Sequence, residues 1–66
     1  MDSYIIPDIR TGLCRAVIER AIRDIDPSAT VAVNIERRVA EIGSNVGDVA
    51  IRGRLAQAGF RAERIG

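Results

Sequence analysis

The chain has 66 residues, of which 47% are hydrophobic and 29% are charged, and its formal net charge is +1. A chain of this length forms one domain with a small core, and its near-neutral charge provides no general attraction to nucleic acid or to an anionic membrane. Histidine is absent and cysteine occurs once, which excludes histidine-based catalysis, sites built on several histidines and an internal disulfide bond. We therefore expect residues 1–66 to be a single compact domain that is not an enzyme and whose partner is neither a nucleic acid nor a membrane.

The first part of the chain predicts a short strand followed by an amphipathic helix. Residues 3–6 form a β-like run that Pro7 closes, because proline cannot donate a hydrogen bond to a sheet. Between residues 13 and 25, apolar side chains recur every three or four positions, as on one face of a helix. Asp26 and Pro27 end this helix, because proline disfavours the helical conformation in the residue before it. The expected buried stripe consists of Leu13, Cys14, Val17, Ile18, Ala21, Ile22 and Ile25.

The middle of the chain predicts a β-hairpin. In residues 30–35, the apolar Val31, Val33 and Ile35 alternate with small or polar residues, which is the pattern of a half-buried strand. A charged turn follows, and residues 38–42 form a second β-like run. We expect Arg37 and Arg38 to lie at this turn and to protect the edge of the sheet.

The last part of the chain predicts a second helix and a fourth strand. Asn45 is placed to cap a helix over residues 46–58, and Asp48 lies in its first turn, where the helix dipole favours an acidic side chain. Gly59 suits the C-terminal end of that helix. Residues 60–65 then form a short strand in which Phe60 faces the core.

The resulting order, βαββαβ, predicts an α+β fold of the ferredoxin-like kind, in which two helices cover one face of a four-stranded antiparallel sheet. This fold hosts metal carriers, RNA-binding modules, acyl phosphatases and regulatory modules, so the fold alone does not assign a function. RNA binding by such a sheet requires stacking aromatic residues and a basic surface. The chain has one tyrosine, one phenylalanine and a net charge of +1, so we do not expect RNA binding.

Three segments resemble the heavy-metal-associated (HMA) domain of copper chaperones and P-type metal ATPases. They are residues 14–22, 32–36 and 55–60, and the resemblance extends over residues 4–65. In that family a Met-x-Cys-x-x-Cys motif ends the first loop and opens the first helix. Aligning the first helix places Cys14 at the second cysteine of the motif, Thr11 at the first and Ile9 at the methionine. The resemblance implies the ferredoxin-like fold with the first and third strands at the centre, and a degenerate metal motif with one thiol.

The resemblance implies a small cytoplasmic domain that binds or transfers a soft metal ion, Cu(I) foremost, through Cys14. Thiolates hold Cu(I), and the neutral hydroxyl of Thr11 cannot replace one. A second sulfur therefore has to come from a low-molecular-weight thiol or from Cys14 of another molecule in a homodimer. We expect binding to be weak or to depend on the dimer. The implied partners are a related metal-binding domain or a metal-transport ATPase, and the N-terminal residues, which lack a secretion signal, agree with the cytoplasm.

The residues around Cys14 leave a second interpretation open. Cys14 lies at a helix N-terminus between Arg10 and Arg15, an arrangement that stabilises a thiolate. Equally, Cys14 could be a small apolar residue of the buried stripe, because free cysteines are among the most buried residues. The loss of one cysteine and of the methionine favours an interaction or regulatory module that keeps the HMA scaffold without a metal.

Two residues near the loop complete the candidate set. The resemblance places Phe60 beside the metal loop, where its ring would shield the loop from water, and simple core packing is the alternative. Asp8 forms no metal site alone, because one carboxylate without neighbours does not hold a hard metal ion. We expect Asp8 to be exposed to solvent.

Overall fold

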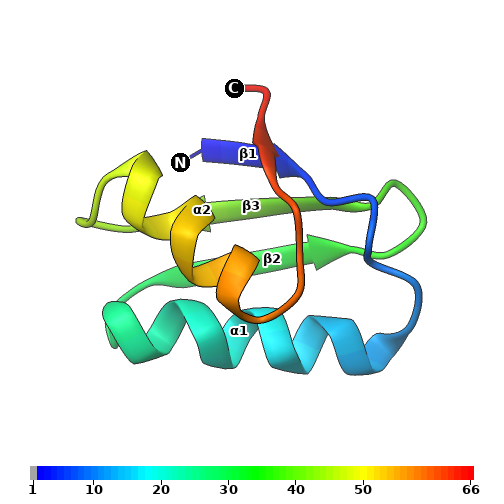
Figure 1. Ribbon diagram of the computed structural model, residues 1–66, viewed down its shortest axis with the longest axis horizontal. Coiled ribbons are helices and arrows are strands. Elements are labelled where there is room, and N and C mark those ends of the chain that lie inside the picture. The colour runs from blue at the N-terminus through cyan, green and yellow to red at the C-terminus, as the bar shows by residue number, and fades with distance from the viewer. Residues whose placement is uncertain (1) are drawn as a thin grey trace.

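A computed structural model describes residues 2–66 and confirms the ferredoxin-like α+β fold. Figure 1 shows one sheet of antiparallel strands with α1 and α2 packed on it. The strand order is β2-β3-β1-β4, so the first and third strands are central, as the resemblance implied. The elements are β1 (Asp2–Ile5), α1 (Gly12–Ile25), β2 (Thr30–Asn34), β3 (Val39–Gly43), α2 (Asp48–Gln57) and β4 (Glu63–Arg64).

The core lies between the sheet and the two helices. Alternation along β3 illustrates how the sheet contributes, because Ala40 and Ile42 are buried while Glu41 between them is exposed. Both aromatic residues face this core, as expected for Phe60, with Tyr4 fully buried and Phe60 8% exposed. The buried apolar cluster contains Tyr4, Ile6, Ile9, Ile18, Ile22, Ala29, Ala40, Ile42, Ile51, Leu55 and Phe60.

The buried stripe of α1 is narrower than the sequence pattern predicted. Ile18, Ala21 and Ile22 are buried. In contrast, the side chains of Leu13 and Val17 are 78% and 44% exposed. These two residues are four positions apart, so they form a row on the helix beside the buried stripe. This row is exposed to solvent because no other element of the fold covers it. Their predicted burial was therefore wrong.

The start of α2 also differs from the prediction. Gly47, not Asn45, is the N-cap of α2, and Asp48 is the first helical residue. The backbone N–H of Asn45 and the hydroxyl of Ser44 both donate to the carboxylate of Asp26, at 3.0 and 2.6 Å. These bonds hold Asn45 in the loop, so the helix begins later.

The end of α2 confirms the role predicted for Gly59. Gly59 has a φ of +92°, which a residue without a side chain adopts at little cost. The N–H of Phe60 donates to the carbonyl of Leu55 at 2.8 Å, and the N–H of Gly59 donates to that of Ala56 at 3.0 Å. This pair of bonds is the Schellman motif, and it turns Phe60 back onto the core.

The hairpin turn gives β3 a later start than expected. The side-chain oxygen of Asn34 accepts the N–H of Arg37 at 3.0 Å, and Arg38 has a φ of +57°, in the left-handed region. The carbonyl of Arg38 accepts the N–H of Ile6 at 2.8 Å, which joins the turn to the chain after β1. Arg38 therefore belongs to the turn, and β3 begins at Val39.

The last strand is shorter than residues 60–65. Only Glu63 and Arg64 pair with β1 as a regular ladder. Two further bonds extend this pairing, because the N–H of Ser3 donates to the carbonyl of Gly66 and the N–H of Ile65 donates to that of Ser3, both at 2.8 Å. The chain turns inward at Phe60 to bury its ring, so residues 60–62 do not extend the strand.

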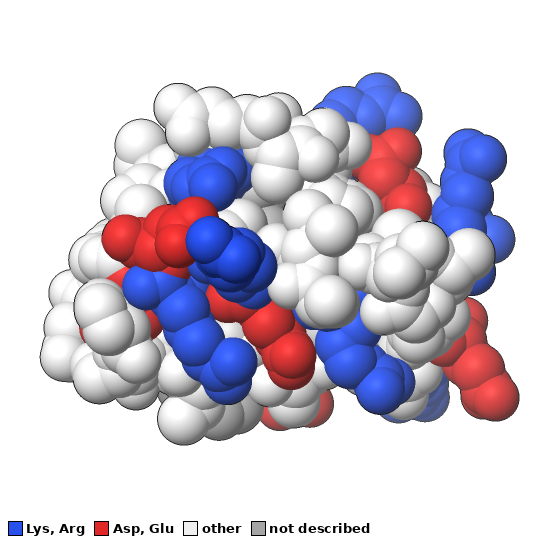
Figure 2. All heavy atoms as spheres, turned by 90° about the horizontal axis from the view of Figure 1, so that it is seen from below, with Lys and Arg blue, Asp and Glu red and all other residues white. Residues whose placement is uncertain are grey.

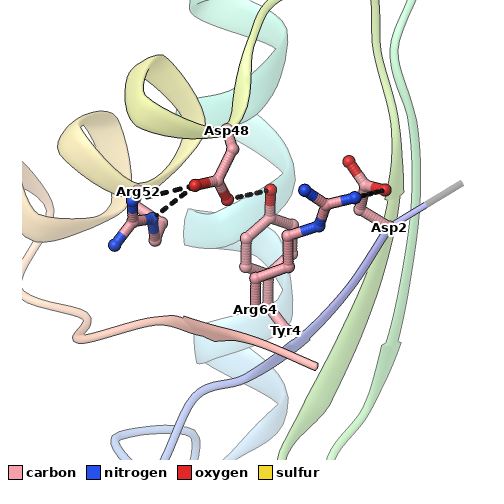
Figure 3. Close-up of polar contacts among 5 residues, drawn as sticks. All are labelled: Asp2, Tyr4, Asp48, Arg52 and Arg64. Carbon is pink, nitrogen blue, oxygen red and sulfur yellow. Dashed lines mark hydrogen bonds and ion pairs between the residues drawn. The ribbon is translucent and has the colours of Figure 1, made fainter. Parts of the chain in front are cut away.

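Two groups of polar contacts join α2 to the central strand β1, and β1 to the edge strand β4 (Figure 3). The hydroxyl of Tyr4 donates to Asp48 at 2.9 Å, and Arg52 binds the other oxygen of Asp48 at 2.8 and 2.9 Å. Arg64 on β4 pairs with Asp2 on β1 at 3.0 Å. Burial, followed by the hydrogen bond to Asp48, raises the pKa of Tyr4 to about 12.

No helix within residues 2–66 has the length and apolar character needed to cross a membrane.

Candidate metal-binding loop

The loop between β1 and α1 carries both residues that the sequence assigned to the metal motif. Thr11 is the N-cap of α1, in an extended conformation and without a hydrogen bond from its side chain to the helix. Cys14 is the third residue of the helix and has a free thiol that is partly exposed. Its side chain packs against the edge of the core, so it is neither a fully buried core residue nor a fully exposed one.

The sulfur of Cys14 has only long contacts. The Oγ1 atom of Thr11 lies 4.0 Å from the Sγ atom, and the thiol donates to the main-chain carbonyl of Asp8 at 3.8 Å. Hydrogen bonds of this length are weak even for sulfur. The structure therefore brings Thr11 and Cys14 together, and the sulfur is not committed to a strong partner.

The environment of Cys14 favours the thiolate. The backbone amide of Arg10, followed by that of Thr11, lowers the pKa of the Cys14 thiol, and the positive charge of Arg10 contributes in the same direction. Partial burial opposes this shift without cancelling it. The lowered pKa increases the fraction of thiolate, which is the form of cysteine that acts as a nucleophile or a metal ligand.

Asp8 has a structural role that the sequence did not predict. It is partly buried, and its carboxylate accepts the backbone N–H of Arg61 at 2.9 Å while its carbonyl accepts the thiol of Cys14. Ile9, at the position of the family methionine, is fully buried and anchors the loop in the core. The expectation that Asp8 is free in solvent was therefore wrong, because Asp8 fixes the loop against the segment that follows α2.

The loop supplies one sulfur ligand. Within residues 2–66, no group of three or more cysteine, aspartate, glutamate or histidine side chains gathers in a way that would hold a metal ion. The Oγ1 atom of Thr11 lies 4.0 Å from the Cys14 sulfur, so the loop brings one soft ligand and one hard hydroxyl oxygen together.

Comparison with known proteins places this loop on a recognisable scaffold. No protein-family model and no curated sequence matches the chain. Among solved structures, the copper chaperone Atx1 from Synechocystis is similar, with a TM-score of 0.89 and 28% identity over 92% of this chain and 97% of that one. The chain is an HMA-like domain.

Two further structures share the fold of this HMA-like domain. A gold-binding protein has a TM-score of 0.94 at 23% identity, over 98% of this chain and 100% of that one. The N-terminal domain of PacS from Synechocystis has a TM-score of 0.84 at 21% identity, over 98% and 96% of the two chains. At these identities the likeness concerns the fold alone.

The HMA-like domain exposes apolar surface directly beside Cys14. Leu13 and Val17 lie on this surface, next to a shallow hollow between α1 and α2. Figure 2 views this side of the molecule and shows basic and acidic side chains mixed around an uncharged area. Beside the hollow, Asp24 pairs with Arg54 at 3.1 Å and with Arg20 at 3.7 Å. The hollow is lined by Ala16, Val17, Arg20, Ala21, Arg54 and Ala58.

At the other end of α1, the HMA-like domain has a polar centre that sequence reasoning missed. Asp26 is 8% exposed and accepts four hydrogen bonds, from the N–H and hydroxyl of Ser28, the hydroxyl of Ser44 and the N–H of Asn45, at 2.6 to 3.1 Å. The Ser44 hydroxyl, followed by the Asn45 amide and Ser28, holds the pKa of Asp26 far below its usual range. The bonds to Ser28 follow the pattern of an Asp turn, which the sequence Asp26-Pro27-Ser28 could have indicated.

Proposed function

We propose that this HMA-like domain binds a soft metal ion, Cu(I) foremost, through the Cys14 thiolate and passes it to a related domain. The observation that carries the proposal is the position of Cys14, a partly exposed thiol with a lowered pKa in the first turn of α1. This turn follows the loop that corresponds to the metal motif on a scaffold shared with a copper chaperone. A soft monovalent ion prefers a thiolate to the oxygen ligands that surround the loop.

The proposal includes a second sulfur from outside the chain. Cys14 is the one cysteine of the sequence, and the hydroxyl of Thr11 is a neutral, hard ligand. The second ligand is Cys14 of another copy in a homodimer or a low-molecular-weight thiol. The exposed Leu13, adjacent to Cys14, gives a second copy an apolar surface to contact. Binding is accordingly weak, or dependent on the concentration of the chain or of the thiol.

The proposed partners follow from the same cargo. A related metal-binding domain or a metal-transport ATPase would receive the ion by exchange of thiolate ligands, and the cytoplasm, where thiols stay reduced, is the proposed compartment. The proposed activity is binding and transfer, with no catalytic step assigned to the chain.

The alternative is an interaction or regulatory module that keeps the HMA scaffold without a metal. The observation that favours it is the combination of Thr11 at the first cysteine position with the exposed Leu13 and Val17 beside it. Such a surface would bind a protein partner whether or not Cys14 held an ion.

A Cu(I) titration separates the two functions. Reduced protein is titrated with Cu(I) in the presence of a competing chelator of known affinity, with and without added glutathione, and Cys14→Ser serves as the thiol-free control. Our proposal predicts about one ion per two chains without glutathione, or one ion per chain that requires it. A folded Cys14→Ser variant that binds Cu(I) as well as the wild type would contradict the proposal, as would a wild type that does not compete with the chelator under either condition. Both results favour the interaction module.

A further inference from the structure

The loop between β1 and α1 begins with a tight turn. The N–H of Ile9 donates to the carbonyl of Ile6 at 3.0 Å, and Pro7 occupies the second position of this turn, where its fixed φ is favourable. Ile6 and Ile9 are fully buried, so both ends of the turn are anchored in the core. The turn therefore presents Asp8, its third residue, between two fixed points.

The carboxylate of Asp8 ties this turn to a segment that is distant in sequence. Its Oδ2 atom accepts the backbone N–H of Arg61 at 2.9 Å. Arg61 directly follows Phe60, whose ring is buried and whose N–H bonds to the carbonyl of Leu55 at the end of α2. Asp8 thus fastens the loop to a part of the chain that is itself fixed on the core, and the segment after α2 runs beside the loop in Figure 1.

The main chain of Asp8 faces the thiol. Its carbonyl oxygen lies 3.8 Å from the Sγ atom of Cys14, and the thiol is directed toward it. A contact of this length does not hold the sulfur in place by itself. The backbone amides of Arg10 and Thr11, which stabilise the thiolate, belong to the same loop. The surroundings of the sulfur therefore depend on where the whole loop is held.

We propose that Asp8 is a positioning residue for the Cys14 thiol, and that it acts through the bond between its carboxylate and the Arg61 amide. The bond holds the loop, and the loop sets the direction of the sulfur. The carboxylate acts as a hydrogen-bond acceptor and not through its charge, because the contact of Asp8 with the sulfur is made by the main-chain carbonyl. Any effect on metal affinity rests on the proposed function, whereas the effect on the orientation of the thiol does not.

The bond can be removed without dismantling the fold. Asp8 is only partly buried and is not a member of the buried apolar cluster, and Arg61 is exposed. The turn keeps its two isoleucine anchors when the carboxylate is lost. We therefore expect variants at Asp8 to fold, and urea denaturation verifies this before the thiol is studied.

The first measurement is the pair of three-bond Hα–Hβ couplings of Cys14 in metal-free, reduced protein. The two rotamers that are common in helices each give one large and one small coupling, whereas exchange between them makes the couplings similar. We expect unequal couplings in the wild type and similar couplings in Asp8→Ala. The Asp8→Asn variant should resemble the wild type, because its side-chain oxygen still accepts the Arg61 amide. Asp24→Ala, at the far end of α1, is the matched control.

A second variant breaks the same bond from its other side. Arg61→Pro removes the N–H donor and leaves the loop sequence unchanged. We expect it to average the couplings of Cys14 as Asp8→Ala does. The double variant should show no further change, because each substitution removes a bond that the other has already broken. If one of the two single variants fails to fold, the other still carries the test.

Competition for Cu(I) with a chelator, in the presence of glutathione, measures the consequence for the proposed function. Groups that hold a metal ligand in place change metal affinity by about 10- to 100-fold when they are removed. Asp8→Ala should therefore bind Cu(I) about tenfold more weakly or more, while Asp8→Asn and Asp24→Ala should match the wild type. A wild type that does not bind Cu(I) contradicts the proposed function, and the couplings of Cys14 then decide this inference alone.

Several results would overturn the positioning role of Asp8. Couplings that are already averaged in the wild type, or that stay unequal in Asp8→Ala and Arg61→Pro, show that the bond does not orient the thiol. An Asp8→Asn variant as averaged as Asp8→Ala would assign the effect to the charge. Averaged couplings combined with an unchanged Cu(I) affinity would show that the orientation of the thiol does not govern metal binding.

Discussion

The two ends of α1 carry polar groups of opposite kinds. At the N-terminal end, the sulfur of Cys14 has contacts of 3.8 and 4.0 Å and is partly exposed. At the C-terminal end, Asp26 is 8% exposed and accepts four hydrogen bonds of 2.6 to 3.1 Å. Both groups have lowered pKa values, so a lowered pKa alone does not distinguish a reactive group from a structural one.

The difference lies in whether the charged form still has room for a partner. The oxygens of Asp26 are saturated by donors from its own turn and from the loop before α2, so its negative charge holds two loops together. The thiolate of Cys14 is stabilised by backbone amides, but no side chain makes a strong hydrogen bond to its sulfur. In this small domain, one end of α1 stabilises the fold and the other end remains available for chemistry.

Removal of the Asp26 carboxylate should have the largest effect on the molecule. We expect Asp26→Ala to leave the chain largely unfolded without denaturant, because four donors lose their acceptor in a buried site. Circular dichroism and the dispersion of amide resonances measure this loss. Asp24→Ala is the control, since Asp24 is an exposed carboxylate whose ion pairs are worth about 0 to 1 kcal/mol. Equal effects of the two variants would show that Asp26 is not a structural centre.

Restoring the missing thiol tests the opposite end. We expect Thr11→Cys to bind one Cu(I) per chain about 100-fold more tightly or more than the wild type, because the second thiolate is then supplied within the same molecule. The fold should tolerate the change, since the Thr11 side chain makes no cap bond to α1. Competition with a chelator measures the affinity, and Thr11→Ser is the matched control. A folded Thr11→Cys variant that binds no better than Cys14→Ser would show that the loop is not a metal site.

The pH dependence of stability should separate the two ends. The pKa of Asp26 is lower in the folded state than in the unfolded state, so the stability that Asp26 provides is complete above pH about 4 and is lost as the pH falls. The pKa of Cys14 is also lowered, so the stability that its thiolate provides is complete above about pH 8.5 and is lost as the pH falls through the lower folded-state pKa. Urea denaturation of the wild type and Cys14→Ser across pH 3 to 9 measures both trends, and the stability difference between the two chains should grow toward alkaline pH. A difference that is constant over this range would contradict the assignment to the thiolate.

The reactivity of Cys14 gives a smaller but more direct measurement. The rate of alkylation by iodoacetamide follows the fraction of thiolate, so its midpoint should lie at a lower pH for the folded chain than for the same chain in urea. Thr11→Ala should change this midpoint little, because the backbone amides of Arg10 and Thr11 are the largest causes of the shift. A higher midpoint in the folded chain would mean that burial outweighs the amides.

The smallest effect is expected at Arg38, which lies in the turn at the same end of the molecule as the loop before α1 (Figure 1). The left-handed conformation of Arg38 costs a residue with a side chain about 1 to 2 kcal/mol. Glycine avoids this cost, but its greater conformational freedom in the unfolded state offsets part of the benefit. We expect Arg38→Gly to raise the free energy of unfolding by about 0.5 to 1 kcal/mol. Urea denaturation checks this, with Arg37→Gly as the control. A similar gain from both variants would indicate a charge effect in place of backbone strain.

Much of the fold was predictable because local patterns determine it. The alternation of Val31 and Val33 with Ala32 indicated the first strand of the hairpin, and the spacing of Ile18 and Ile22 indicated the buried side of α1. The C-terminal glycine of α2 was also predictable, since the left-handed conformation at Gly59 is one that favours glycine.

The errors arose where residues distant in sequence compete for the same groups. Asn45 is a good capping residue by type, but the carboxylate of Asp26 takes its backbone N–H, and no local pattern reveals that contact. Leu13 and Val17 have the helical spacing of core residues, yet only the packed structure shows that no neighbour covers them. For the site, the sequence located Cys14 and Thr11, while the role of Asp8 depends on a bond to Arg61 from the far end of the chain.

That bond has a practical consequence for experiments on the thiol. The carbonyl of Asp8 accepts the thiol proton of Cys14, and the carboxylate of the same residue accepts the amide of Arg61. Loss of the thiol proton removes the first bond and leaves a thiolate beside the carbonyl of Asp8, whose carboxylate holds the Arg61 amide through the second. We therefore expect the nitrogen and proton resonances of Arg61 to shift with the ionisation of Cys14, which would report the state of the thiol without any label on the sulfur itself.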